Sequence, residues 1–132
     1  MNSNKFSMKS RFGSFRFALK GLLSLLKYEH NSRIHLLAAI VVISMGILLK
    51  IDHYEWALLI ILIGVVFITE LLNSSLESLA DLIEPERNEL IMRAKDYSAG
   101  AVLIAAIISV VVGSLIFIPK LLDLIKTSTQ VS

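Results

Sequence analysis

Residues 97–119 read YSAGAVLIAAIISVVVGSLIFIP and contain no charged side chain over 23 positions. About 20 apolar residues of helix cross the hydrocarbon core of a bilayer, so this stretch predicts a membrane span. Two earlier runs are also apolar: residues 34–49 carry no charge, and residues 56–76 carry only Glu70. We therefore expect an all-α integral membrane protein with three transmembrane helices. The predicted spans are residues 31–50, 55–76 and 97–119.

Composition indicates one membrane domain rather than a soluble one. Of the 132 residues, 55% are hydrophobic and 18% are charged, against about 25% charged in soluble domains. We expect a domain over residues 11–126, between a frayed N-terminus at 1–10 and a tail at 127–132. The chain has no cysteine, which excludes a disulfide framework and thiolate chemistry.

Basic side chains are concentrated before the first predicted span. Residues 1–33 hold seven Lys or Arg and one acid, Glu29, and residues 77–96 add Arg87, Arg93 and Lys95. The positive-inside rule places both segments in the cytoplasm. Topology and anionic lipid account for this basic excess, so we expect no nucleic-acid partner.

The N-terminal segment has the pattern of an amphipathic helix. Between residues 12 and 26 the apolar side chains recur at helical spacing, with Arg16, Lys20 and Lys27 on the opposite face. A basic amphipathic helix next to a membrane span is suited to lying in the membrane interface. We expect an interfacial helix over residues 11–29, with an ordinary packing helix as the alternative.

A polar stripe follows the second apolar run, where residues 70–81 read ELLNSSLESLAD. An α-helix turns about 100° per residue, so one face carries four polar side chains within about 60°. These are Glu70, Asn73, Glu77 and Asp81. Ionisable groups are costly at membrane depth and usually mark a functional site.

Each charged residue near this stripe has a functional and a structural interpretation. Glu70 is flanked by apolar residues and suits a general base, or it is a structural acid bonded to a neighbouring helix. Glu77, with Glu29 as a second ligand, suits Mg²⁺, or its carboxylate belongs to a solvated helix face. Lys95, followed by Asp96, holds a phosphate or extends its ammonium toward water. The three histidines do not have the spacing of a metal site, and the six glycines form no soluble phosphate-binding loop.

The polar stripe resembles the signature of the prokaryotic diacylglycerol kinases and the related undecaprenol kinases, E-x-[aliphatic]-N-[ST]-[SA]-[aliphatic]-E-x-x-[aliphatic]-D. Residues 70–81 match it in full. The supporting matches are Lys20-Gly21, Glu29 before the first span, and RAKD at residues 93–96 followed by AGAVL. They occur in the family's order and spacing over residues 11–119.

The resemblance implies a lipid kinase of the bacterial inner membrane, assembled as a homotrimer with active sites shared between subunits. It implies that ATP and Mg²⁺ are used to phosphorylate a membrane lipid alcohol. Glu70 would be the catalytic base, Asn73 would orient it, and Glu29 and Glu77 would hold Mg²⁺. The implied ATP contacts are Phe17, Glu29, Glu77, Glu86, Asn88, Lys95 and Asp96.

One residue and two segments differ from the better-known diacylglycerol kinases. Phe17 stands where those enzymes carry a Tyr, and the turn EPERN at residues 84–88 lacks their Tyr-His. Residues 29–35, EHNSRIH, resemble the undecaprenol-kinase branch and favour undecaprenol over diacylglycerol as the lipid.

Two other classes of protein are weighed against a kinase. A small multidrug transporter has four spans with its acid in the first, whereas here Glu70 ends the second of three. For a non-enzymatic membrane protein, the polar stripe would be an unexplained energetic cost. Magnesium-dependent ATP binding would distinguish a kinase from both.

Overall fold

A computed structural model describes residues 8–83 and 88–129, which form four α-helices and no strand. The helices are α1 (Met8–Tyr28), α2 (His30–Leu48), α3 (His53–Ile83) and α4 (Glu89–Thr129). In this described part, α2, α3 and α4 are long and apolar enough to cross a membrane. The all-α class and the three predicted spans are therefore confirmed.

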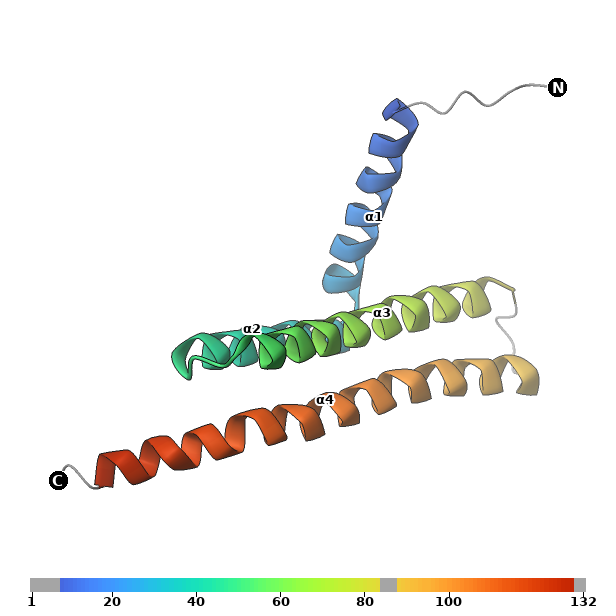
Figure 1. The fold of residues 1–132 in the computed structure, drawn as a ribbon. Helices are drawn as coiled ribbons and strands as arrows, with labels where there is room; N and C mark the ends of the chain where they lie inside the picture. The colour runs from blue at the N-terminus through green and yellow to red at the C-terminus, as the bar shows by residue number, and fades with distance from the viewer. Residues whose placement is uncertain (1–7, 84–87, 130–132) are drawn as a thin grey trace.

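The three long helices form the body of the molecule. The antiparallel helices α3 and α4 lie side by side, α2 packs against α3, and α1 rises away from them (Figure 1). The guanidinium of Arg33 joins α1 to α2, because its Nε donates to the Leu26 carbonyl at 2.9 Å and its Nη2 to that of Lys27. Placement of α1 in the membrane interface stays a prediction.

Two helix boundaries differ from those expected. Helix α1 begins at Met8, so residues 8–10 are helical rather than frayed. Helix α4 begins at Glu89 and continues past Pro119, where the third span was expected to end. Proline removes one backbone hydrogen bond, but here the apolar sequence continues as helix beyond it. At 1.5 Å per residue, α4 is about 60 Å long, about twice the thickness of the hydrocarbon core.

The turn between α2 and α3 has a helix cap on each side. The amides of Lys50 and Ile51 donate to the carbonyls of Ile47 and Gly46, and Lys50 has a φ of 52°. This is a Schellman motif with lysine in the left-handed position. On the α3 side, Asp52 Oδ1 accepts the amides of Tyr54 and Glu55, and Glu55 Oε2 accepts the amide of Asp52. That reciprocal pair is a capping box.

The apolar core lies next to this turn. Its buried side chains come from the turn, α3 and α4: Ile51, Leu59, Ile116 and Phe117. An ion pair joins the same ends of α3 and α4, because Lys120 Nζ lies 2.9 Å from Glu55 Oε2. Most large apolar side chains elsewhere on α2 to α4 are exposed. Such surfaces suit contact with lipid or with other subunits.

Candidate active site

Glu70 is a buried carboxylate between α2 and α3. Only 3% of the residue is exposed, and the buried polar residues in the described part of the chain are Glu70 and Ser32. Ser32 Oγ donates to Glu70 Oε2 at 3.2 Å, and His35 Nε2 lies 3.1 Å from Glu70 Oε1. The first two turns of α2 therefore hold this carboxylate in place.

The two oxygens of this carboxylate are not equivalent. Oε2 accepts the Ser32 hydroxyl, whereas Oε1 is buried and receives no hydrogen bond from any described residue. His35 Nε2 lies near Oε1 but does not form a hydrogen bond with it. Buried polar atoms normally have partners, so an open buried oxygen calls for an explanation.

One helical turn further on, Asn73 joins α3 to α4. Its Nδ2 donates to Glu77 Oε1 at 3.0 Å, and its Oδ1 accepts from Ser98 Oγ at 2.7 Å. The Ser98 hydroxyl also lies 2.9 Å from the Lys95 carbonyl. Asn73 is thus held by hydrogen bonds from α3 and α4, and it orients Glu77. Its predicted role of orienting Glu70 stays a prediction.

The last polar residue of the stripe also contacts α4. Asp81 Oδ1 lies 2.8 Å from Lys95 Nζ. Since both side chains are substantially exposed, this ion pair contributes little to stability. It does place a lysine ammonium beside the Asp81 end of the stripe, where a phosphate would be attracted to it.

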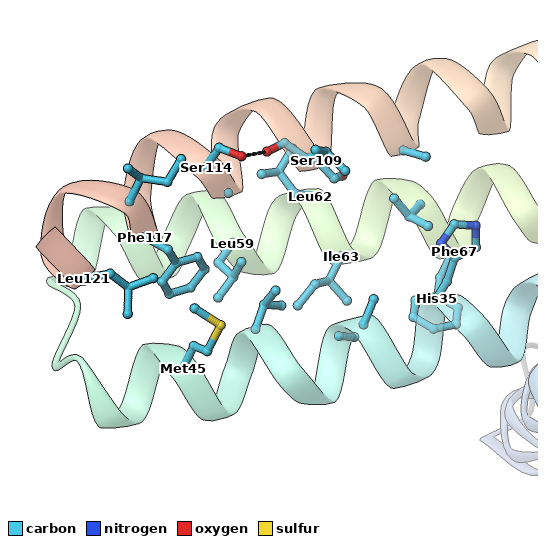
Figure 2. A pocket seen from close by; sticks show the side chains of 18 residues that line it. His35, Met45, Leu59, Leu62, Ile63, Phe67, Ser109, Ser114, Phe117 and Leu121 are labelled. Carbon is cyan, nitrogen blue, oxygen red and sulfur yellow. Dashed lines mark hydrogen bonds between the residues drawn. The ribbon is translucent and has the colours of Figure 1, made fainter.

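An apolar cavity of about 440 Å³ lies between α2, α3 and α4. His35 and Phe67 are at one end, and Phe117 and Leu121 are at the other (Figure 2). His35 therefore lines the cavity and also contacts the Glu70 carboxylate. A polar head at His35 and an apolar chain along the cavity would match this surface.

The other predicted nucleotide-site residues within the described part of the chain are on α1, at the cap of α4 and on α4. Phe17 is exposed on α1, with Lys20 Nζ 5.9 Å from its ring centre, and Asp96 is exposed on α4. Asn88 Oδ1 accepts the Leu90 amide and so caps α4. Glu86 lies outside the described residues. The nucleotide contacts assigned to these residues stay predictions.

The donor set for a metal ion is small. Glu29 precedes α2, is partly buried, and does not use its side chain to cap that helix. No group of three His, Asp or Glu side chains in the described segments could hold a metal ion. Magnesium commonly uses one or two carboxylates together with waters and substrate phosphates. Glu29 and Glu77 are therefore chemically suited to Mg²⁺ bound with a nucleotide.

Three side chains in this arrangement were not among the predicted site residues. Ser32, His35 and Ser98 were missed because each belongs to a different helix from the residue that it contacts. The sequence did contain a signal for Ser32 and His35. Ser32 and His35 are three residues apart, on one face of a helix that carries no charged residue from Ile34 onward.

Sequence comparisons identify a family and several relatives of this chain. A sequence model of the family described as prokaryotic diacylglycerol kinase matches residues 16–117. The chain belongs to this family. It is 41% identical to the undecaprenol kinase of Bacillus subtilis, over 83% of this chain and 89% of that protein. It is also 41% identical to a diacylglycerol kinase of Synechocystis, over 84% of this chain and 64% of that protein.

Another relative, a diacylglycerol kinase of Haemophilus influenzae, is 36% identical over 79% of this chain and 89% of its own length. As a member of the prokaryotic diacylglycerol kinase family, the chain is a membrane lipid kinase. The four-span transporter is set aside, because the described helices include three candidate spans. The identity is the same, 41%, to an undecaprenol kinase and to a diacylglycerol kinase, so it favours neither lipid.

Proposed function

We propose that this protein transfers the γ-phosphate of ATP to the hydroxyl of a membrane lipid, undecaprenol or diacylglycerol, with Glu70 as the general base. One observation carries the proposal. The buried Glu70 carboxylate begins the polar stripe of α3 and contacts His35, which lines the apolar cavity. A lipid alcohol needs this combination, because its chain is apolar and its reacting group must be deprotonated.

In the proposed reaction the lipid hydroxyl donates a hydrogen bond to Glu70. As the hydroxyl oxygen bonds to the γ-phosphorus, its proton passes to the carboxylate and ADP leaves with the electrons of the broken P–O bond. Glu70 then returns the proton to water. A general base contributes about 10²- to 10⁴-fold to such a rate. The remaining catalysis is positioning and charge neutralisation, since phosphoryl transfer has a loose transition state.

Glu29 and Glu77 would hold Mg²⁺, which neutralises phosphate charge when it is bound. The Asn73–Glu77 hydrogen bond, at 3.0 Å, supports a fixed orientation of that carboxylate. We assign nucleotide contact to Lys95 and Asp96 at the start of α4. Phe17, Glu86 and Asn88 would complete the nucleotide site.

The proposal includes an assembly and a topology. We infer a homotrimer with shared active sites in the bacterial inner membrane, with the N-terminus and the α3–α4 connection in the cytoplasm. The extensive exposed apolar surface of α2 to α4 supports contact with lipid and with other subunits. The basic residues of α1 support its position at the anionic cytoplasmic surface.

The test is transfer of labelled γ-phosphate from ATP to undecaprenol and to diacylglycerol, offered in parallel to purified protein in detergent with Mg²⁺. The key variant is Glu70→Gln, for which we expect at least about a 100-fold loss of kcat with the assembly unchanged by size-exclusion chromatography. Asp123→Asn is the matched control, because it makes the same acid-to-amide change at an exposed position near the end of α4.

Transfer to one lipid in preference to the other identifies the substrate. Near-normal turnover by Glu70→Gln would contradict the assignment of the base. Absence of wild-type transfer to both lipids would contradict the proposed substrates.

A further inference from the structure

Ser32 and His35 form a two-residue contact around the Glu70 carboxylate. They lie three residues apart on α2, and both reach across to α3. Ser32 is fully buried, and the Glu70 side chain is 4% exposed. A hydrogen bond between such groups is kept because breaking it would leave a buried polar atom without a partner. The contact is therefore a fixed part of the fold rather than a chance surface pairing.

The geometry separates the tasks of the two carboxylate oxygens. Oε2 accepts a hydrogen bond from the Ser32 hydroxyl. No other described residue donates a hydrogen bond to the Glu70 carboxylate. Oε1 lies 3.1 Å from His35 Nε2 and retains an open lone pair.

We propose that Ser32 and His35 are positioning residues that make Oε1 of Glu70 the atom that accepts the lipid's proton. The inference rests on the function proposed above. Ser32 occupies Oε2, and His35, which lies at one end of the apolar cavity, contacts Oε1 and sets its direction. The O–H bond of the lipid breaks as its oxygen bonds to the γ-phosphorus, the proton goes to Oε1, and ADP leaves with the electron pair of the broken P–O bond.

His35 also fixes where the lipid lies relative to the base. Its imidazole, with 22% of the side chain exposed, lines the cavity and contacts Oε1. In this inference, His35 contacts the first part of the lipid chain and also orients the carboxylate of Glu70. An error of about 1 Å in such an arrangement can lower a rate about 100-fold.

The experiment compares three substitutions at His35 in the purified full-length protein. In His35→Gln, the amide nitrogen reaches about as far as Nε2 and keeps a polar nitrogen beside Oε1. In His35→Asn, the same amide group is one carbon shorter, and His35→Leu has no polar nitrogen. We expect kcat within about threefold of wild type for Gln and about 10- to 100-fold lower for Asn and Leu. The KM for ATP should not change in any of them.

Ser32→Ala tests the other half of the contact and should lower kcat about 10-fold through poorer alignment of the base. Its matched control is Ser44→Ala on the same helix, because the Ser44 hydroxyl bonds to a carbonyl of its own helix, that of Ile40. We expect wild-type kinetics from the control.

The outcomes separate this inference from the proposed function. The positioning role would be overturned if His35→Gln and His35→Asn had equal kcat. It would also be overturned if His35→Gln lost as much kcat as His35→Leu. An inactive Glu70→Gln together with wild-type kcat in His35→Leu would overturn the inference and leave the proposed function standing. An active Glu70→Gln would overturn the function itself.

Discussion

Ser98 Oγ lies 2.7 Å from Asn73 Oδ1, in a hydrogen bond between residues 25 positions apart that joins α4 to α3. The amide nitrogen of Asn73 is thereby directed at Glu77 Oε1. Ser98 thus acts on the carboxylate of Glu77 through Asn73, although Ser98 itself has no charge and lies outside the polar stripe.

We expect Ser98→Ala to lower kcat about 10-fold and to leave the fold intact, because the orientation of Asn73 and Glu77 is loosened. Steady-state kinetics of phosphate transfer measures this. Ser78→Ala is the control, since the Ser78 hydroxyl bonds to the Ser74 carbonyl within its own helix. Wild-type kinetics in Ser98→Ala would show that Asn73 needs no support from α4.

Glu77 is expected to determine the magnesium requirement. In Glu77→Gln the side chain still accepts the Asn73 hydrogen bond, but the negative charge is lost, and hard divalent cations bind carboxylates far better than amides. We predict at least about a 10-fold higher Mg²⁺ concentration for half-maximal activity, with a lower kcat. A magnesium titration at saturating ATP tests this. Asp123→Asn, near the exposed end of α4, is the control. An unchanged titration midpoint in Glu77→Gln would refute the assignment of Glu77 as a magnesium ligand.

Gly46 is expected to be intolerant of a side chain. A Cβ at this position would lie 3.0 Å from atoms of Ile51 and Trp56, closer than normal packing allows. Overpacking of this kind typically costs about 1–3 kcal/mol. Gly46→Ala should therefore lower the thermal unfolding temperature in detergent. Gly113→Ala should not, because a Cβ added there would meet no described side chain or neighbouring helix within 4 Å, and alanine favours helix.

The amino-acid pattern predicts the helices better than it predicts the contacts between them. The three spans follow from apolar runs, and the buried position of Glu70 follows from its apolar flanks. The contacts of Ser32, His35 and Ser98 depend on which faces of α2, α3 and α4 meet, and local periodicity carries no information about that. The extension of α4 past Pro119 was missed for a related reason. Proline removes one backbone hydrogen bond, but the residues on both sides of it determine whether the helix continues.

The last prediction concerns the turn between α2 and α3, at the opposite end of α3 from the polar stripe. The pKa of Asp52 is held below its ordinary value of 3.8, first by the hydrogen bond from the Glu55 amide and then by that from Tyr54, against the opposing effect of desolvation. A carboxylate with a lowered pKa in the folded state stabilises that state above its unfolded pKa. This contribution is lost as the pH falls through the folded pKa.

Asp52→Asn keeps an oxygen that can cap α3 but removes the charge. We expect its unfolding temperature to lie below that of wild type at neutral pH, and the difference to persist down to about pH 4 and to shrink as the pH falls further. Circular dichroism melts of both proteins in one detergent, from about pH 7 to about pH 2, measure it. The difference between the two proteins at each pH reports the effect of the Asp52 charge. A difference that stays constant over this range would mean that the charge of Asp52 does not stabilise the cap.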